Sequence, residues 1–330
     1  MTRRKMVALV SLIGCACLSV QATEAEAPLL TVGVVADPQY ADTAPRGGRT
    51  PREVPRRLKL AVDHFNRHQV NFVVSLGDFI DWDDIDYTWP PVTDVTTRSD
   101  WAHFETLNAI WQQIEAPRYH VLGNHEWYVP DRADDGEKPG RVFRKFGFKD
   151  KGYYDFAEQG FRFVILDGND RYMYAYPKGS PAYIDAKAYY DALPRHLPER
   201  RDWNGAISQQ QLSWLRATLA DAQEKQQRVV VCCHYPIHEP AEPHTLLNHA
   251  ELRAVLDAFP HVVLWLNGHN HQGGYALANE HQPNQRHHLN LKGMQNGDGA
   301  HYRLQFFEDS IDVYRAESAQ PERRLMIRKE

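Results

Sequence analysis

The stretch NFVVSLGDFID, residues 71–81, decides the fold because it joins an apolar, β-forming run to a glycine and an acidic side chain. Residues 72–76 predict a short buried strand, and Gly77 ends it. Asp78 then lies where the strand opens into a loop. A carboxylate at the tip of a buried strand is costly unless a positive charge meets it. A Gly-Asp pair alone is typical of a solvated turn, so the ends of the other strands decide whether Asp78 binds a metal.

Four other predicted strands also end in residues of metal-binding type. Apolar, β-rich runs at 31–36, 118–122, 228–233 and 262–266 predict these strands. They are followed by Asp37 and Gln39, by Asn124 and His125, by His234, and by His269 and His271. An amphipathic helix predicted at 54–68 makes the start of the chain a strand–helix–strand unit, and open α/β sheets bind ligands beyond the carboxyl ends of their strands. One shared site is therefore favoured over five separate turns.

The remainder of the chain predicts a single α/β domain over residues 29–316. Further helices are predicted at 101–114, 208–224 and 250–259, and further strands at 153–156, 161–166, 289–291, 302–307 and 311–314. Residues 127–205 have the least regular pattern and are interpreted as an insertion, a kind of segment that commonly forms a lid or a substrate wall. Residues 317–330 are interpreted as a C-terminal tail.

The residue types at the strand ends indicate two-metal hydrolysis. Carboxylate, carboxamide and imidazole ligands without thiolate suit Mn²⁺, Fe²⁺ or Zn²⁺. One shared carboxylate holds two ions about 3.5–4 Å apart, and a hydroxide held there is a strong nucleophile at neutral pH. The ions also neutralise phosphoryl oxygens, which favours a phosphate ester or anhydride as the substrate. Peptide hydrolysis is disfavoured because the sequence has no His-Glu-x-x-His helix. An imidazole that binds no metal, His125, is suited to protonate the leaving oxygen.

The ordered set of motifs resembles the calcineurin-like metallophosphoesterase superfamily. The motifs are Asp37-x-Gln39, Gly77-Asp78, Gly123-Asn124-His125-Glu126, His234 and Gly268-His269-x-His271, within residues 31 to about 307. This resemblance implies an α/β fold of four layers, an αββα sandwich with mixed sheets. The usual first motif has His where this chain has Gln39, whose neutral amide is a weaker ligand.

A closer resemblance is to the manganese-dependent ADP-ribose/CDP-alcohol diphosphatases, whose first motif also carries Gln. It rests on Gln39-Tyr40-Ala41-Asp42, on His234-Tyr235-Pro236-Ile237-His238, on residues 268–275 and on the helix start at 207–215. By this resemblance metal one is held by Asp37, Gln39, Asp78 and His271, and metal two by Asp78, Asn124, His234 and His269. His125 is the catalytic imidazole. The implied cofactors are two divalent ions, with Mn²⁺ favoured over Fe²⁺, Zn²⁺ or Mg²⁺, and the implied reaction is cleavage of the diphosphate of ADP-ribose or CDP-alcohol-like nucleotides.

Aromatic residues beside the motifs are candidates for stacking on a nucleobase. They are Tyr40, Trp82, Trp127 and Tyr275, and packing within the domain is the alternative for each of them. Two other functions stay open. One is a phosphodiesterase or phosphomonoesterase of the same superfamily with another substrate. The other is a non-catalytic, exported protein that binds metal or nucleotide, which the complete ligand set and His125 disfavour.

The overall composition indicates a globular protein with a small-molecule partner. The chain of 330 residues has a formal charge of −5 at pH 7, with 42% hydrophobic and 25% charged residues. This balance does not favour binding to a nucleic-acid polymer. The adjacent Cys232 and Cys233 fall in an apolar strand and are predicted to be buried thiols without a disulfide.

The N-terminus predicts export. Three basic residues at 3–5 precede an apolar run at 6–20, which is typical of a signal peptide, here over residues 1–22. The segment 12–15 also resembles a bacterial lipobox, so a lipid anchor at Cys15 is the alternative. We expect a periplasmic or extracellular protein, with the soluble form favoured over the lipid-anchored one.

Overall fold

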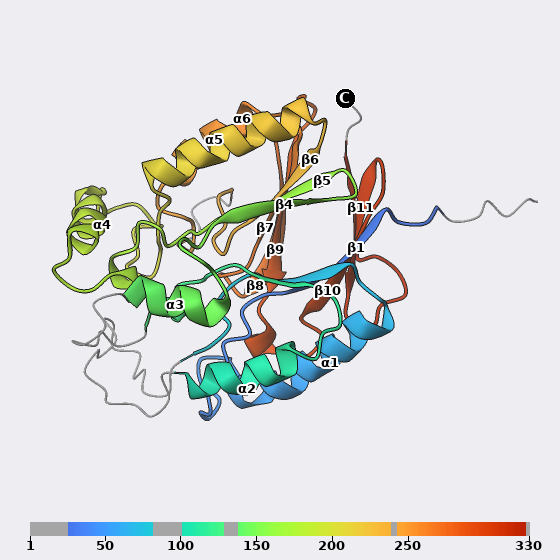
Figure 1. The fold of residues 1–330 in the computed structure, drawn as a ribbon, viewed down its shortest axis with the longest axis horizontal. Coiled ribbons are helices and arrows are strands. Elements are labelled where there is room, and N and C mark those ends of the chain that lie inside the picture. The colour runs from blue at the N-terminus through green and yellow to red at the C-terminus, as the bar shows by residue number, and fades with distance from the viewer. Residues whose placement is uncertain (1–25, 82–100, 129–137, 239–242, 328–330) are drawn as a thin grey trace, which may run out of the picture.

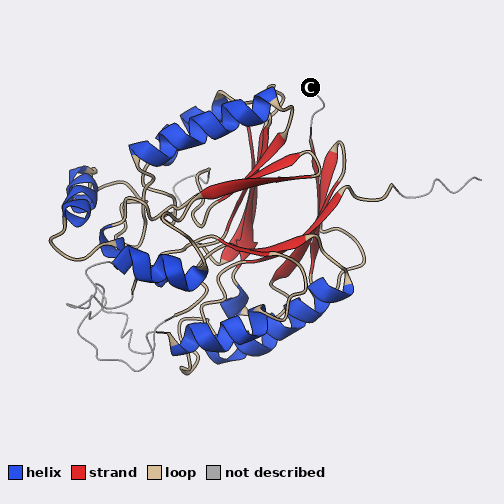
Figure 2. Ribbon diagram, viewed as in Figure 1, coloured by secondary structure: helices blue, strands red, loops and turns tan. Residues whose placement is uncertain are grey.

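The computed structural model describes residues 26–81, 101–128, 138–238 and 243–327, and it contains two six-stranded sheets packed face to face. Figure 1 shows both sheets between two layers of helices, and Figure 2 shows the strands gathered in the middle of the molecule. The predicted four-layer αββα sandwich is confirmed. The predicted signal peptide over 1–22, with its lipobox cysteine Cys15, lies outside the described residues. Among the residues described, no helix is long and apolar enough to cross a membrane.

The first sheet has the strand order β12-β11-β10-β1-β2-β3. Its strands are β1 (Leu30–Val35), β2 (Phe72–Ser75), β3 (Arg118–His120), β10 (His301–Phe306), β11 (Ser310–Arg315) and β12 (Arg323–Met326). Strands β1, β2 and β3 run parallel, and β10 continues the sheet antiparallel to β1. The parallel half therefore delivers the segments after β1, β2 and β3 to one edge.

The second sheet has the strand order β4-β5-β6-β7-β9-β8. Its strands are β4 (Tyr154–Glu158), β5 (Phe161–Ile165), β6 (Arg228–Cys232), β7 (Val262–Asn267), β8 (Gln272–Ala278) and β9 (Arg286–Lys292). Strands β5, β6, β7 and β9 run parallel, and the edge strands β4 and β8 are antiparallel to their neighbours. Strands β6 and β7 also place the segments that follow them at one edge.

Helices cover the outer face of each sheet. Helices α1 (Val54–Arg67) and α2 (Ala102–Trp111) share an apolar cluster with the first sheet. Helices α5 (Gln209–Glu224) and α6 (His249–Asp257) share another with the second sheet. Helix α3 (Lys138–Phe146) adds Val142 and Phe146 to the cluster of α1 and α2. Helix α4 (Pro181–Ala192) lies at one end of the molecule (Figure 1) and buries one residue, Ala186. Short 3₁₀ helices are η1 (Pro51–Glu53), η2 (His125–Trp127), η3 (Met173–Ala175) and η4 (Met294–Asn296).

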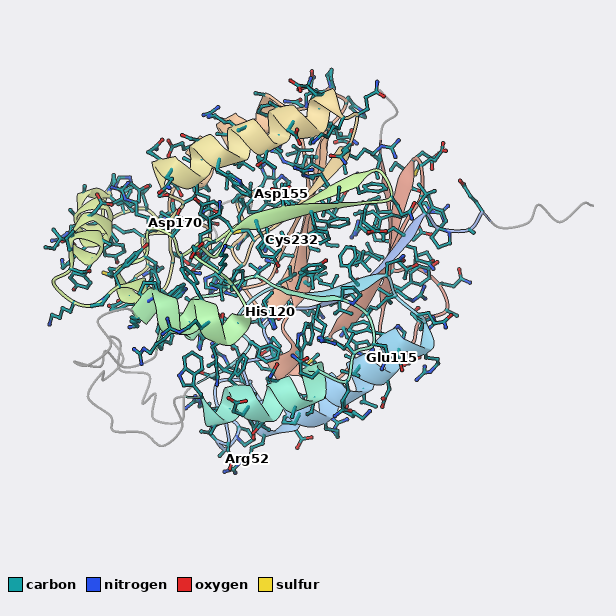
Figure 3. All side chains as sticks on the ribbon, in the orientation of Figure 1. Arg52, Glu115, His120, Asp155, Asp170 and Cys232 are labelled. Atoms are coloured by element: carbon teal, nitrogen blue, oxygen red, sulfur yellow. The ribbon has the colours of Figure 1, made fainter. Side chains whose placement is uncertain are left out.

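The layer between the sheets holds the two halves of the molecule together. The Phe163 ring of the second sheet lies edge-on to Phe72 and Phe306 of the first, with ring centroids 4.9 and 5.7 Å away. Each fully buried side chain of this size contributes about 1.5–3 kcal/mol to the free energy of folding. Cys232, labelled in Figure 3, is buried in the same layer, and it and Cys233 are free thiols as predicted. Burial raises the pKa of the Cys233 thiol to about 12, so it stays protonated.

Several elements lie within the predicted insertion or the predicted tail. Strand β12 belongs to the predicted tail 317–330 but pairs with β11, so the first sheet continues beyond residue 316. The predicted insertion 127–205 includes β4 and β5, which are part of the second sheet. It also includes α3 and α4, and α4 has a Ser180 N-cap and Pro181 at its first position. The apolar pattern could not show α4, because a helix with a single buried residue has no apolar stripe.

Candidate metal centre

The seven predicted ligands and His125 follow the carboxyl ends of five strands, and we call them the metal centre. Asp37 and Gln39 follow β1, Asp78 follows β2, Asn124 and His125 follow β3, His234 follows β6, and His269 and His271 follow β7. The first three strands belong to one sheet and the last two to the other. The site therefore lies where the two sheets meet, as expected for carboxyl ends of parallel strands.

Left-handed backbone turns aim these side chains at one another. Among the described non-glycine residues with positive φ are Asp37 (46°), Gln39 (45°), Asp78 (51°), His269 (72°) and His271 (63°). Such conformations cost of order 1–3 kcal/mol each and cluster at functional sites. Gly77 also has a positive φ of 94°, and a Cβ atom there would lie 2.6 Å from the backbone nitrogen of Gly123. The turns after β2 and β3 thus approach each other more closely than side-chain-bearing residues allow.

Asp78 is fully buried at the middle of the centre. Its Oδ1 accepts the backbone N–H of His125 at 2.9 Å, and its Oδ2 accepts the Gln39 amide at 2.7 Å. Its Oδ2 also lies 3.3 Å from His234 Nε2. Burial alone would raise the pKa of Asp78, but the positive charges of His234 and His125 hold it well below its usual range. Asp78 is therefore the permanent negative charge of the site.

Two groups of potential ligand atoms share Asp78. In one group, atoms of Asp37, Asp78 and His271 lie within 4.8 Å of one another. In the other, atoms of Asp78, His234 and His269 do so. Burial raises the pKa of Asp37 to about 7, and the nearby Asp78 adds to this effect. Two anionic side chains held this close require cations between them, which is the arrangement of a two-metal site.

Two buried amide oxygens test whether the residues fit metal ions. Gln39 Oε1 and Asn124 Oδ1 are buried and have no hydrogen-bond partner among the described residues. Their amide nitrogens are engaged, Gln39 Nε2 with Asp78 and Asn124 Nδ2 with the Tyr128 hydroxyl at 2.8 Å. An unpaired buried acceptor costs about 1–3 kcal/mol. Gln39 Nε2 also lies 3.2 Å from His271 Nε2, so this amide borders the group that contains His271. A metal ion would give the two amide oxygens the partner they lack, so the residues present fit two divalent ions.

Hydrogen bonds also fix which nitrogen each imidazole presents. His234 donates Nδ1–H to the carbonyl of Leu76 at 2.8 Å, so Nε2 faces Asp78. His269 donates Nε2–H to Asn204 Oδ1 at 2.9 Å, so its Nδ1 faces His234 Nε2, 2.9 Å away. The Asn204 amide is oriented in turn, because its Nδ2 donates to the carbonyls of Glu199 and Pro243. Partners of this kind set the tautomer of a metal-binding histidine.

Glu126 anchors the turn that carries Asp78. Its buried carboxylate accepts three backbone N–H groups, those of Gly123 at 2.6 Å, Phe79 at 2.7 Å and Asp78 at 2.9 Å. Burial and the charge of Asp78 raise the pKa of Glu126 to about 7. The sequence motif contained Glu126, but the sequence analysis assigned it no role. The feature of the sequence that could have indicated a role for Glu126 is its position directly after His125.

His125 is placed as an imidazole beside the metal ligands. Its Nε2 lies 3.8 Å from Asp78 Oδ2, and its Nδ1 lies 3.0 Å from Asp81 Oδ1. Burial lowers the pKa of His125, but the charges of Asp78 and Asp81 outweigh this and raise it. Asp81 also faces Arg46 and Arg49, and its pKa is lowered to about 2 despite burial, chiefly by His125. Asp81, the last residue of the stretch 71–81, thus orients His125 and favours its protonated form, a role that the sequence alone does not show.

The residues predicted to stack on a nucleobase differ in their burial and in their contacts. Tyr40 is half-buried beside the centre, edge-on to His103 at 5.2 Å. Trp127 is 1% exposed and packs against Phe143, so its predicted stacking role is wrong and the packing alternative holds. Tyr275 donates to or accepts from His287 at 2.9 Å and lies under the Arg323 guanidinium at 4.0 Å, so its ring is already covered. Trp82 lies outside the described residues.

The chain is similar in sequence and in fold to known phosphoesterases. Residues 30–273 match the calcineurin-like phosphoesterase family. The manganese-dependent ADP-ribose/CDP-alcohol diphosphatase of Oryza sativa subsp. japonica is 30% identical over 273 residues, covering 76% of this chain and 80% of the relative. The protein of that name from Arabidopsis thaliana is 31% identical over 277 residues, covering 77% and 83%. A dimetal phosphatase from Danio rerio has the same fold, with a TM-score of 0.76 and 24% identity over 91% of this chain and all of that chain.

We predict that the affinity for Mn²⁺ falls as the pH falls. A metal ligand must be deprotonated. Burial opposes protonation of His234, but the charge of Asp78 raises its pKa to about 9, and the pKa of Asp37 is about 7. Below pH 9 a proton therefore competes with the ion at His234, and below pH 7 a proton competes with the other ion at Asp37. The apparent dissociation constant of the ion at His234 should rise roughly tenfold per pH unit from pH 8.5 through 7.5 to 6.5, whereas that of the ion at Asp37 should begin to rise only towards pH 6.5.

Isothermal titration calorimetry of the metal-free chain at these three pH values measures this dependence. The matched control is His281→Asn, which removes a histidine that is 82% exposed and should leave the affinity unchanged. An affinity that does not vary with pH would contradict the assignment of His234 and Asp37 as ligands.

Proposed function

Because this chain belongs to the calcineurin-like phosphoesterase family and, within it, to the family of manganese-dependent ADP-ribose/CDP-alcohol diphosphatases, we propose that it hydrolyses the diphosphate of ADP-ribose or CDP-alcohol-like nucleotides. The chain is a metal-dependent phosphohydrolase. The observation that carries the proposal is the pair of ligand groups that share Asp78, together with two buried amide oxygens, those of Gln39 and Asn124, that have no hydrogen-bond partner among the described residues.

The proposed ligand sets are those implied by the sequence motifs. One ion is held by Asp37, Gln39, Asp78 and His271, and the other by Asp78, Asn124, His234 and His269. When bound, two such ions activate a water molecule and neutralise the phosphoryl oxygens. The side chains of the protein contribute orientation, because Asn204, Glu126 and the backbone turns fix the ligands before substrate arrives.

His125 is proposed to transfer the proton that the leaving group needs. Asp78 and Asp81 raise the pKa of the imidazole and so favour its protonated form, and Asp81 holds its Nδ1 while Nε2 lies 3.8 Å from Asp78 Oδ2. Cleavage of the P–O–P bond expels a phosphate monoester with negative charge on the leaving oxygen, and a positioned acid of this kind contributes typically 10²–10⁴-fold to the rate. Arg46 and Arg49 lie behind Asp81 and keep that carboxylate ionised.

A second candidate is a phosphodiesterase or phosphomonoesterase of the same superfamily. It is favoured by the positions of the aromatic residues, since Trp127 is buried and Tyr275 is covered by Arg323. Of the described members of the predicted stacking set, Tyr40 and Tyr275 are half-buried, and Arg323 lies over the ring of Tyr275. The metal centre serves either reaction equally well, so substrate turnover decides between them.

We predict that nucleoside-diphosphate-linked substrates are hydrolysed faster than the alternatives. The metal-loaded chain should be incubated with ADP-ribose, CDP-choline, cyclic nucleotides and simple phosphomonoesters, each with Mn²⁺, Mg²⁺ and Zn²⁺ in parallel. The expected result is nucleoside monophosphate released from ADP-ribose or CDP-choline, fastest with Mn²⁺. Turnover of monoesters alone would reject the diphosphatase and retain the phosphohydrolase, and no metal-dependent turnover of any substrate would reject both.

We also predict that His125→Ala lowers kcat by about 10²–10⁴-fold without loss of metal, because the side chain donates a proton and binds no ion. Steady-state kinetics and metal analysis of the same preparation provide the two measurements. His281→Ala is the control, since this histidine is exposed and should leave both values unchanged. If His125→Ala instead loses an ion or keeps full activity, the role assigned to His125 is wrong.

A further inference from the structure

A second cluster of metal-binding residues lies on the helix-covered face of the first sheet. His64 comes from α1, His301 from the start of β10, and Glu317 from the segment directly after β11. One ring nitrogen of each histidine and one carboxylate oxygen of Glu317 lie within 4.8 Å of one another. Figure 1 shows α1 along the sheet that contains β10 and β11, which explains how residues so distant in sequence meet.

The two histidines of this cluster are buried and lack hydrogen bonds that would account for them. His64 is fully buried, and His301 is 6% exposed. The Nε2 atoms of both rings are buried without a hydrogen-bond partner among the described residues. His64 Nδ1 lies 3.0 Å from Glu317 Oε1, but the pair falls outside hydrogen-bond geometry. Leaving such ring nitrogens unpaired costs about 1–3 kcal/mol each, and the part of the chain that the structure describes supplies no partner for them.

The surroundings of the cluster keep both imidazoles neutral, which is the form that binds a metal ion. Burial lowers the pKa of His64, and burial lowers that of His301 to about 4, so both rings are neutral at pH 7. Arg67 binds the second oxygen of Glu317 at 2.7 Å and thereby fixes the carboxylate. The Arg303 guanidinium lies on the Tyr314 ring at 4.2 Å, and its charge also keeps His64 neutral. A carboxylate that binds an arginine through one oxygen still offers the other to an ion.

We propose that His64, His301 and Glu317 bind a Zn²⁺ ion, distinct from the metal centre. Two imidazoles and one carboxylate are a common ligand set for zinc, and the exposed side of Glu317 leaves the fourth position of a tetrahedral ion to water. The ion links α1 to the β10–β11 half of the first sheet. Its role is structural, because it joins three elements of the fold. The inference does not depend on the proposed function, since none of its ligands belongs to the metal centre.

The test counts zinc ions bound by the full chain. Metal-free protein is dialysed against buffered Zn²⁺, and the ions per chain are measured by mass spectrometry. The chain should bind three ions, and Glu317→Gln should bind two, with the affinity of the third site lowered at least about tenfold. Glu280→Gln is the matched control, because Glu280 is an exposed glutamate that lies 3.8 Å from a histidine, His281. It should bind three ions.

A second measurement separates the cluster from the metal centre. In the Asp78→Asn chain, which is impaired at the centre, Zn²⁺ should still raise the midpoint of thermal unfolding, and adding Glu317→Gln should abolish that rise. His301→Gln, checked for folding by circular dichroism, should behave as Glu317→Gln does. An ion count that Glu317→Gln leaves unchanged, or a thermal shift that Glu317→Gln leaves intact, would overturn the proposal. Because the readouts are stoichiometry and stability, failure of substrate turnover would not affect them.

Discussion

The structure depends on one buried carboxylate, Asp78, placed where two sheets meet. An ionised carboxylate without water is among the most costly groups a protein can bury, so its surroundings must supply positive charge and donors. His234 and His125 supply charge, while the His125 backbone and the Gln39 amide donate hydrogen bonds. These groups come from both sheets, so the surroundings of Asp78 are complete only when the two sheets are packed together. The apolar layer stabilises the contact of the sheets, and the parallel strands bring the ligand residues to their common carboxyl ends.

The parts of the fold that the sequence predicted are those whose local pattern matches their burial. Strands β1, β2, β6 and β7 are buried along their length and appear as continuous apolar runs, and α1 and α5 bury one stripe. Strands β8 and β12 are edge strands with exposed residues, so their sequences carry no such run. Helix α4 packs one side chain and is defined by its cap. Helices and strands that bury few of their side chains leave no periodic apolar pattern in the sequence, so periodicity cannot reveal them.

Within the site, too, the sequence predicts residues that follow a local pattern and does not predict those that act through distant contacts. The ligand types were predictable because they end successive strands, and parallel strands end at a common edge. Glu126, Asp81 and Asn204 were not assigned roles, because each acts on another residue through a contact that the sequence does not show. Asn204 lies in the segment interpreted as an insertion. This segment therefore orients the metal-centre residue His269. Trp127 and Tyr275 were predicted to stack on a nucleobase because they stand beside the motifs in the sequence. Residues that are neighbours in the chain often point to opposite sides of a turn, so this position does not bring their rings into the site.

The central claim is that Asp78 bridges two ions, and anomalous diffraction at the manganese absorption edge tests it most directly. Crystals of the chain grown with Mn²⁺ should show two peaks about 3.5–4 Å apart, one on each side of the Asp78 carboxylate. Gln39 Oε1 should contact one peak and Asn124 Oδ1 the other, because these are the oxygens without another partner. A single peak, or two peaks that Asp78 does not bridge, would contradict the account.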